Sequence, residues 1–472
     1  MVRADETGVQ SRRRAVFLGR FLTGAFVAAV AATGLPAPAR APAAPEVQQE
    51  TVDLAGGASA VRGAATATRT AAAAPGWFTR VRTSFPPQLV GFTWEGAPTG
   101  AVEVRARAGR RWTPWFDVHA DPDEAPDPGT GEGAGPTAAG PVWLGDGVGS
   151  VEVRVEEGRL RDLRMEAIRS VEPAGSGSGI AGAGALPGAP GIVSRSAWGA
   201  AGWASGNSGC GSGPRYAIPR FGVVHHTVTG NGYRPDQSDD LLRGIQAFHI
   251  RTNGWCDIAY NFLVDRYGRV FEGRAGGVDR GPIGGHTKGF NEGAIGVALL
   301  GDFAAAGVPG AMRSGLRSLL SWKFGLHGID AGGHTVEVSG GSTKIPAGRT
   351  VRLPRLFGHR KVALTACPGQ FAYPLMTALR RELRPAPPLP GLGHYRGPHL
   401  RRGSRGRSVV AWQFLLIAVH HSRISADGAF GPQTERATKG FQRSKGIEAT
   451  GGVGPRTIAA MNGAVDWLNA RR

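Results

Sequence analysis

Two segments of this 472-residue chain have almost no side chains that could build a hydrophobic core. Residues 172–190 read EPAGSGSGIAGAGALPGAP, which is typical of a flexible linker. Residues 385–390 read PAPPLP, which favours stiff polyproline geometry. Because the chain is also too long for one ordinary core, we expect separate domains. The predicted divisions are 1–41, 42–75, 76–173, 174–190, 191–385, 386–398 and 399–465, and the second, fourth and sixth of these are linkers.

The first 41 residues predict an export signal. Arg12, Arg13 and Arg14 precede an apolar run over 21–32, and Ala39-Arg40-Ala41 is a candidate cleavage site. A twin-arginine signal and an ordinary secretory signal both fit this pattern. An uncleaved anchor is the alternative, although the run is shorter than the ~20 residues that a membrane span needs. We therefore expect a secreted protein, extracellular or associated with a cell wall.

The region 76–173 predicts a small all-β domain. Residues 88–94, 101–106 and 150–155 alternate or are β-branched, as strands facing one core do. An acidic loop rich in Gly and Pro interrupts them at 120–140, and the Ala/Pro/Thr-rich residues 42–75 predict a disordered linker. Trp112 and Trp115 fit either a sugar-stacking platform or the domain core, and no chemistry is assigned to this domain.

The region 191–385 alternates between strand and helix patterns, which predicts an α/β fold. An apolar strand over 221–226 ends in two histidines, and Ser238 is a candidate cap for the next helix, with Gly254 as its stop. Further expected elements are a hairpin closed around Tyr267-Gly268, a buried strand over 294–300, an amphipathic helix through Leu316 to Phe324, and a β-hairpin between Val336 and Leu353.

The loop GHRKVALTACPG, residues 358–369, places an imidazole at His359 and a thiol at Cys367. This donor pair suits Zn²⁺ better than a hard cation, and His225 at a strand end can supply a third ligand. Three protein ligands leave one position open, which is typical of a catalytic zinc site. A surface His359, a disulfide-bonded Cys367 and a core His225 are the alternatives.

The cysteine count is odd for an exported chain, since Cys210, Cys256 and Cys367 are the only three. Cys210 and Cys256 both lie in polar, Gly-rich segments, where an oxidising compartment would tend to pair them. That pairing would leave Cys367 as the free thiolate that zinc requires.

Four motifs occur together in this region: IVSRSAWGA at 192–200, VHHT at 224–227, WCDIAYNF at 255–262 and the 358–369 loop. In this order they resemble the peptidoglycan recognition proteins, a family related to phage-type amidases. The resemblance implies a mixed central sheet with flanking helices, a surface groove and bound Zn²⁺. It also implies a zinc-dependent N-acetylmuramoyl-L-alanine amidase of bacterial peptidoglycan.

The same resemblance assigns roles to individual residues. It implies His225, His359 and Cys367 as zinc ligands, Tyr260 and Thr365 as catalytic residues, His226, His286 and Arg360 as substrate contacts, and Cys210–Cys256 as a disulfide. The alternative is a non-catalytic sensor of the same fold, but such sensors commonly lack the cysteine. Lys361 and Ala259 depart from the usual family residues, and neither departure removes a ligand.

The C-terminal region contains two similar units, DGAFGPQT at 427–434 and GGVGPRT at 451–457. They resemble a three-helix peptidoglycan-binding domain, although the usual acidic residue before the second glycine turn is missing. Ten Arg or Lys against two acids over 396–445 suit anionic wall polymers, and a solvated basic face is the alternative.

The net charge of +19 alone would also allow nucleic acid or a membrane surface as the partner. The chain has no zinc finger, no RNA-binding signature and no long basic helix, which disfavours nucleic acid. We expect a monomer that binds peptidoglycan, with no membrane contact once the signal is removed.

Overall fold

A computed structural model describes residues 45–54, 76–96, 101–133, 135–157, 160–171, 188–383 and 393–470, the last apart from four positions between 421 and 427. The predicted export signal and most of both predicted interdomain linkers lie outside these residues. None of the helices within the described ranges combines the length and apolarity that a bilayer span requires.

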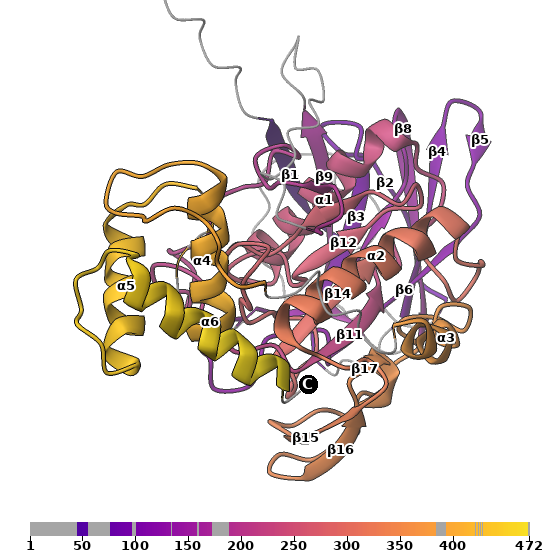
Figure 1. Cartoon of the computed structure of the whole chain (residues 1–472). Helices are drawn as coiled ribbons and strands as arrows, with labels where there is room; N and C mark the ends of the chain where they lie inside the picture. The colour runs from indigo at the N-terminus through magenta and orange to yellow at the C-terminus, as the bar shows by residue number, and fades with distance from the viewer. Residues whose placement is uncertain are drawn as a thin grey trace, which may run out of the picture. The chain divides into compact units, whose positions relative to one another are not determined.

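The predicted all-β domain, which we call the accessory domain, runs from β1 to β9 (residues 46–171). It contains two β-sheets, drawn in indigo and purple in Figure 1. One has the order β1-β9-β3-β7, and the other has the order β2-β8-β4-β5 with β6 also paired to β4. Alternating apolar side chains of both sheets form one buried core, which includes Phe92, Val104 and Val153. The strands are β1 (Glu46–Asp53), β2 (Phe78–Val81), β3 (Leu89–Glu95), β4 (Ala101–Ala108), β5 (Arg111–Trp112), β6 (Phe116–His119), β7 (Thr137–Trp143), β8 (Val148–Glu157) and β9 (Arg161–Val171).

Strand β1 corrects the prediction that residues 42–75 are a disordered linker. Residues 46–53 pair antiparallel with β9 over their whole length, from Glu46 opposite Val171 to Asp53 opposite Arg164. Their sequence, EVQQETVD, is mostly polar because the strand lies at a sheet edge. Its hydrogen bonds to β9 stabilise it, and a polar edge strand leaves little trace in a hydrophobicity pattern.

The region 191–385 is an α/β domain built on a six-stranded mixed sheet, which confirms the predicted fold class. The strand order is β10-β13-β12-β14-β11-β17, and every neighbouring pair is parallel except β12 with β13. The antiparallel pair is the hairpin predicted around Tyr267-Gly268. The strands are β10 (Ile192–Val193), β11 (Phe221–His226), β12 (Phe262–Val264), β13 (Val270–Glu272), β14 (Ala294–Leu299) and β17 (Leu356–Gly358).

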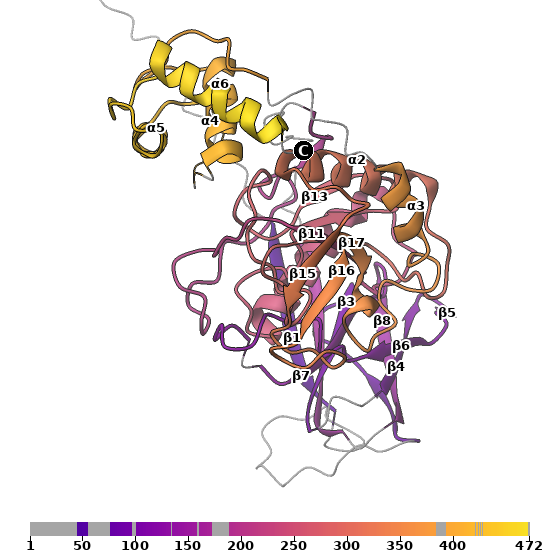
Figure 2. The same ribbon diagram turned by 60° about the horizontal axis from the view of Figure 1, so that its bottom comes forward.

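Helices cover both faces of this sheet. On one face, α2 (Gly310–His327) and α3 (Leu375–Glu382) lie side by side and share a core with side chains of β11, β12 and β14 (Figure 1, Figure 2). On the other face, η1 (Pro235–Gln237) leads into α1 (Ser238–Ala247), and the π-helical turn η2 (Phe248–Thr252) follows.

Ser238 does not cap α1, contrary to the prediction. The N-cap position is Gln237, the last residue of η1, so Ser238 is already the first residue of the helix. The Ser238 hydroxyl instead donates to Asp265 Oδ2 at 3.0 Å.

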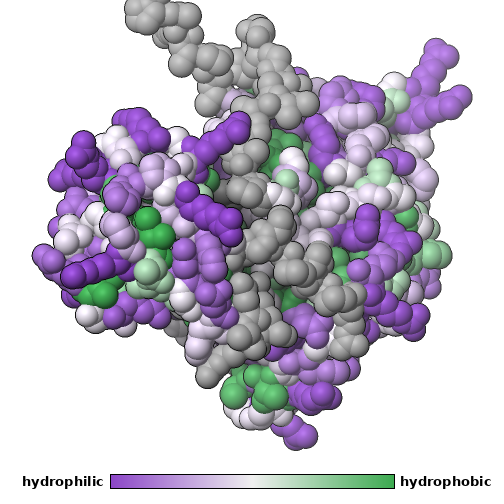
Figure 3. All heavy atoms as spheres, in the orientation of Figure 1, coloured by the Kyte–Doolittle hydropathy of each residue, from purple (hydrophilic) through white to green (hydrophobic). Residues whose placement is uncertain are grey.

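The predicted hairpin between Val336 and Leu353 is present as β15 (His334–Val338) paired with β16 (Thr350–Pro354). Val336 and Val338 are each 65% exposed. The hairpin lies at the bottom of Figure 3, where green hydrophobic atoms gather.

The accessory domain and the α/β domain share a hydrophobic core through α1. Leu89, Trp143 and Ile168 pack in one buried cluster with Ile245 and Phe248. The contact is too close for a side chain at position 91, since a Cβ there would lie 2.2 Å from the Phe248 ring. Burial of this apolar surface fixes the accessory domain against the α/β domain.

The C-terminal region consists of three helices, α4 (Arg407–His420), α5 (Pro432–Ser444) and α6 (Pro455–Ala470). Gln413 Oε1 accepts from Gly428 N, and its amide donates to Thr434. Gln442 makes the same pair of bonds to Gly451 and Thr457. The repeated sequence units are therefore repeated structural units, and in each of them a threonine hydroxyl accepts a hydrogen bond from a glutamine amide.

Cys210 and Cys256 form a disulfide that closes a 46-residue separation around β11 and α1. Replacing both with alanine is expected to lower the free energy of unfolding by roughly 3–4 kcal/mol, because the unfolded chain regains the entropy of that loop. Urea denaturation of the wild type and the double variant measures the difference. Wild type under reducing conditions is the control, and an unchanged midpoint in the variant would contradict the expected role.

Candidate functional site

Strand pairing brings two histidines together at one edge of the central sheet. In the parallel pair β11 and β17, Val224 lies opposite Gly358. The next residues, His225 in β11 and His359 directly after β17, therefore lie side by side. His359 begins the turn η3 (His359–Lys361), and the loop after it returns Cys367 to the same point.

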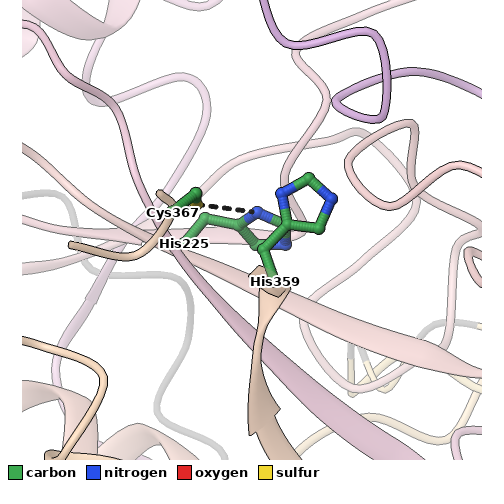
Figure 4. A group of neighbouring side chains, drawn as sticks. All are labelled: His225, His359 and Cys367. Carbon is green, nitrogen blue, oxygen red and sulfur yellow. Dashed lines mark hydrogen bonds between the residues drawn. The ribbon is translucent and has the colours of Figure 1, made fainter. Parts of the chain in front are cut away.

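The side chains of His225, His359 and Cys367 converge in Figure 4. Their candidate ligand atoms all lie within 4.8 Å of one another, and Cys367 Sγ is 3.6 Å from His225 Nδ1. The exposed fractions are 0%, 0% and 4%, and Cys367 is not in a disulfide. The three residues predicted as metal ligands are thus adjacent and directed at one another.

The chemistry of this group fits a zinc ion. Neither ring nitrogen of the buried His359 makes a well-formed hydrogen bond, and an imidazole buried in this way is costly unless it has another partner. Two imidazoles and one thiol within 4.8 Å of one another form a donor set that zinc prefers. His225, His359 and Cys367 would hold the ion.

A second layer of polar side chains orients His225. Its Nε2 is 3.0 Å from His286 Nδ1 and 3.2 Å from the hydroxyl of Thr287, which leaves Nδ1 directed at Cys367. Asn291 Oδ1 accepts from the backbone N–H of His286 at 2.8 Å. Gly296 of β14 makes room for the imidazole of His286, because a Cβ at this position would lie 2.2 Å from its Nε2.

Tyr260 and Thr365, the two predicted catalytic residues, lie beside this group. The Tyr260 ring centroid is 5.4 Å from that of His225, and the backbone N–H of Cys367 donates to the Thr365 hydroxyl at 3.1 Å.

The three predicted substrate contacts differ in their surroundings. His286 is fully buried against His225, and His226 is 3% exposed and accepts from the N–H of Phe303. Arg360 donates to the carbonyl of Ala366 at 2.5 Å. Their role toward substrate stays a prediction.

Two carboxylates from the accessory domain reach the site, and sequence reasoning missed both. The Tyr260 hydroxyl donates a hydrogen bond to Glu124, and the Thr365 hydroxyl donates one to Asp121 Oδ2 at 2.7 Å. Asp121 Oδ2 also lies 3.7 Å from His359 Nδ1. Both acids belong to the loop over 120–140 that the sequence marked as acidic and rich in Gly and Pro. No motif linked that loop to the predicted metal ligands, which are more than 100 positions away along the chain.

Three segments of the chain match known protein families. A family model described as N-acetylmuramoyl-L-alanine amidase matches residues 215–370, and one described as a putative peptidoglycan binding domain matches residues 405–461. Residues 38–178 match a model described as Rv3811 N-terminal galactose-binding domain-like. Peptidoglycan-recognition protein SC2 of Drosophila simulans is 32% identical over 178 residues, which are 38% of this chain and 80% of that protein. The chain belongs to the peptidoglycan-recognition protein family.

Other members of the peptidoglycan-recognition protein family and related amidases are also similar to the chain. Peptidoglycan-recognition protein SC1a of Drosophila melanogaster is 30% identical over 178 residues, which are 38% of this chain and 80% of the relative. A crystal structure of human PGRP-IBETAC in complex with glycosamyl muramyl pentapeptide is 28% identical, with a TM-score of 0.31, and covers 40% of this chain and 95% of its own. A structure of the amidase LysC from Clostridium intestinale is 23% identical, with a TM-score of 0.30, and the match covers 41% of this chain and 98% of LysC.

Burial sets the protonation of this family member's site. It lowers the pKa of His225 well below its ordinary value, and the neighbouring histidines add to the decrease. Burial also lowers the pKa of His359, although the Asp121 carboxylate opposes that shift. Both imidazoles are therefore neutral at neutral pH, which is the form that binds a metal.

The hydrogen-bonded pair of Tyr260 and Glu124 keeps its protons at neutral pH. Burial raises the pKa of Glu124 to about 8, and the Asp121 carboxylate adds to the increase. Burial and the adjacent Glu124 raise the pKa of Tyr260 well above its ordinary value.

Replacing His286 with alanine is expected to weaken zinc binding by about 10–100-fold, because His225 loses the partner that orients its ring. Gly296→Ala should also weaken zinc binding, because the added methyl group would displace the imidazole of His286. Competition with a chelating indicator measures the dissociation constant, and His399→Ala, at an exposed histidine, is the control. Unchanged affinity in both site variants would contradict a supporting role for His286.

Proposed function

We propose that this protein hydrolyses the amide between the N-acetylmuramoyl lactyl group and L-alanine in bacterial peptidoglycan, with zinc bound by His225, His359 and Cys367. The convergence of these three buried side chains within 4.8 Å carries the proposal. The amidase-type domain matched over 215–370 supplies the substrate class.

The residues around the ligands suit amide hydrolysis. When bound, a zinc ion supplies Lewis acidity toward the amide carbonyl and toward a water nucleophile. The phenol of Tyr260 keeps its proton, so it can donate a hydrogen bond to the oxyanion that develops on the carbonyl. The Thr365 hydroxyl lies close enough to Cys367 to orient the attacking water. Loss of one oxyanion donor typically lowers the rate by about 10²–10³.

A non-catalytic sensor of the same fold is the competing function, since other recognition proteins among the similar structures hold a peptidoglycan fragment, as in the complex of PGRP-LE with tracheal cytotoxin. The complete set of two imidazoles and a free thiol favours the enzyme, because binding peptidoglycan alone does not need a zinc-type donor set.

The rest of the chain fits delivery of this activity to a cell wall. The three-helix domain over 399–465 would bind peptidoglycan, and its ten basic residues over 396–445 would add attraction to anionic wall polymers. The predicted export signal over 1–41 would take the protein out of the cell, where a Cys210–Cys256 disulfide is stable.

Cys367→Ser and His359→Ala are expected to reduce muropeptide hydrolysis by at least about 10³-fold, since each removes a ligand and with it the Lewis acid. The activity of the full-length protein is measured by mass spectrometry of the new ends that it releases from muropeptides. The measurement is made without a chelator, with a chelator, and after zinc is restored. His394→Ala, at a partly exposed histidine of the C-terminal region, is the control. Full activity in either ligand variant, or activity that a chelator leaves unchanged, would contradict the proposed hydrolase.

A further inference from the structure

Residues 121–132 form an acidic segment that lies over the candidate metal centre. The segment has five carboxylates and no Lys or Arg, in a chain whose net charge is +19. It leaves the accessory domain after β6 and returns before β7. We propose that this acidic segment is a built-in inhibitor that blocks the substrate-binding face until it is displaced. The inference rests on the proposed amidase function for the identity of the blocked face.

The first part of the acidic segment occupies the polar groups that the proposed reaction uses. Asp121 accepts from Thr365 at 2.7 Å, and Glu124 accepts from Tyr260. Both hydroxyls are thereby engaged by acidic side chains of the same chain. A substrate carbonyl could not receive either hydroxyl proton while these bonds persist.

The remaining carboxylates anchor the acidic segment to three separate places on the α/β domain. Asp123 accepts from the backbone N–H of Thr343 at 2.9 Å. Asp127 accepts from the N–H of Gly289 at 2.7 Å and from the amide of Asn291 at 2.8 Å. Glu132 makes a salt bridge to Arg274 at 2.7 Å, in which the side chains are 9% and 2% exposed. These anchors hold the segment across the site from end to end.

Burial of the metal centre is the consequence. His225, His359 and Tyr260 are at most 1% exposed and Cys367 is 4% exposed, whereas Asp121 and Glu124 above them are 21% and 24% exposed. In the proposed reaction, the substrate must reach the site formed by His225, His359, Tyr260 and Cys367. With the acidic segment in place, these four residues expose almost no surface to a polymer such as peptidoglycan.

The composition of the contacts suits a displaceable cover. The accessory domain is fixed to the α/β domain by apolar packing. Apart from a contact of Ala125 with that apolar cluster, the acidic segment is held by hydrogen bonds and ion pairs, which water and salt can replace. Gly129 and Gly131 have positive φ and are exposed, at one end of the segment. The segment can therefore leave the site while the two domains remain packed together.

The test loosens the anchors and spares the residues at the metal centre. The variant is Asp123→Ala/Asp127→Ala/Glu132→Ala in the full chain, and the charge-matched control is Glu46→Ala/Glu95→Ala/Glu156→Ala, at exposed carboxylates of the same domain. The first measurement is the rate at which a thiol reagent modifies Cys367 in zinc-free protein without reductant. The second is kcat/KM of the zinc-loaded protein for a soluble muropeptide. Circular dichroism and thermal unfolding check that each variant is folded.

Thiol modification is expected to be about tenfold faster or more in the anchor variant, because a buried group reacts through local opening and the anchors oppose that opening. A parallel rise in kcat/KM is expected, with no change in the control. Faster modification without hydrolysis by any form would support the block and refute the amidase. Modification rates within about twofold of the wild type, or a fall in kcat/KM, would overturn the block and favour a catalytic role for the segment.

If the anchor variant does not fold, a second design gives the same information. A recognition site for a specific protease is inserted at Gly129, which is exposed, and the folded full chain is compared before and after cutting. Faster modification of Cys367 after the cut supports the block, and an unchanged rate overturns it.

Discussion

The register between β11 and β17 is the constraint on which the rest of the site depends. Because Val224 lies opposite Gly358 in a parallel pair, His225 and His359, which are 134 residues apart in sequence, lie next to each other at the ends of these strands. A shift of one residue would place His225 beside the wrong backbone position and direct its side chain to the other face. Gly358 itself can have no side chain, since a Cβ there would lie 2.7 Å from Pro368, next to Cys367. The same contact thus brings the thiol to the histidines.

Burying so many polar groups is costly, and the structure offsets the cost with hydrogen bonds. His225 has His286 and Thr287 as hydrogen-bond partners. Asn291 Oδ1 accepts from the backbone N–H groups of His286 and Thr287 and so holds these two partners in place. Asn291 also donates to Asp127, so the polar layer around the predicted metal ligands continues into the acidic segment. The accessory domain is therefore part of the site's polar network, although none of its residues is a predicted metal ligand.

Sequence predicted those features that depend on local pattern or on a motif. The strand ending in His225, the hairpin at Tyr267-Gly268 and the three C-terminal helices all have strong patterns of this kind, and the structure confirms them. Strand β1 escaped prediction because a polar edge strand is stabilised by a partner far along the chain. Ser238 was misassigned because Asp265, which binds its hydroxyl, is equally invisible to a local pattern.

The carboxylates of Asp121 and Glu124 were missed for a related reason. An acidic loop rich in Gly and Pro is usually solvated, and its composition alone does not indicate a buried partner. The apolar contact between η2 and the accessory sheets, which involves Leu89 and Phe248, brings the loop close to Tyr260, and polar contacts far along the chain hold it there. Long-range packing of whole domains thus decides which residues surround the site.

The most direct test of the account is X-ray absorption spectroscopy at the zinc edge on full-length protein loaded with one equivalent of Zn²⁺. Ligation by His225, His359 and Cys367 predicts one sulfur at about 2.3 Å together with nitrogen or oxygen ligands at about 2.0–2.1 Å. The imidazole scattering should decrease in a His359→Ala protein. A coordination shell without sulfur, or one that the loss of His359 leaves unchanged, would contradict the assignment of the metal centre.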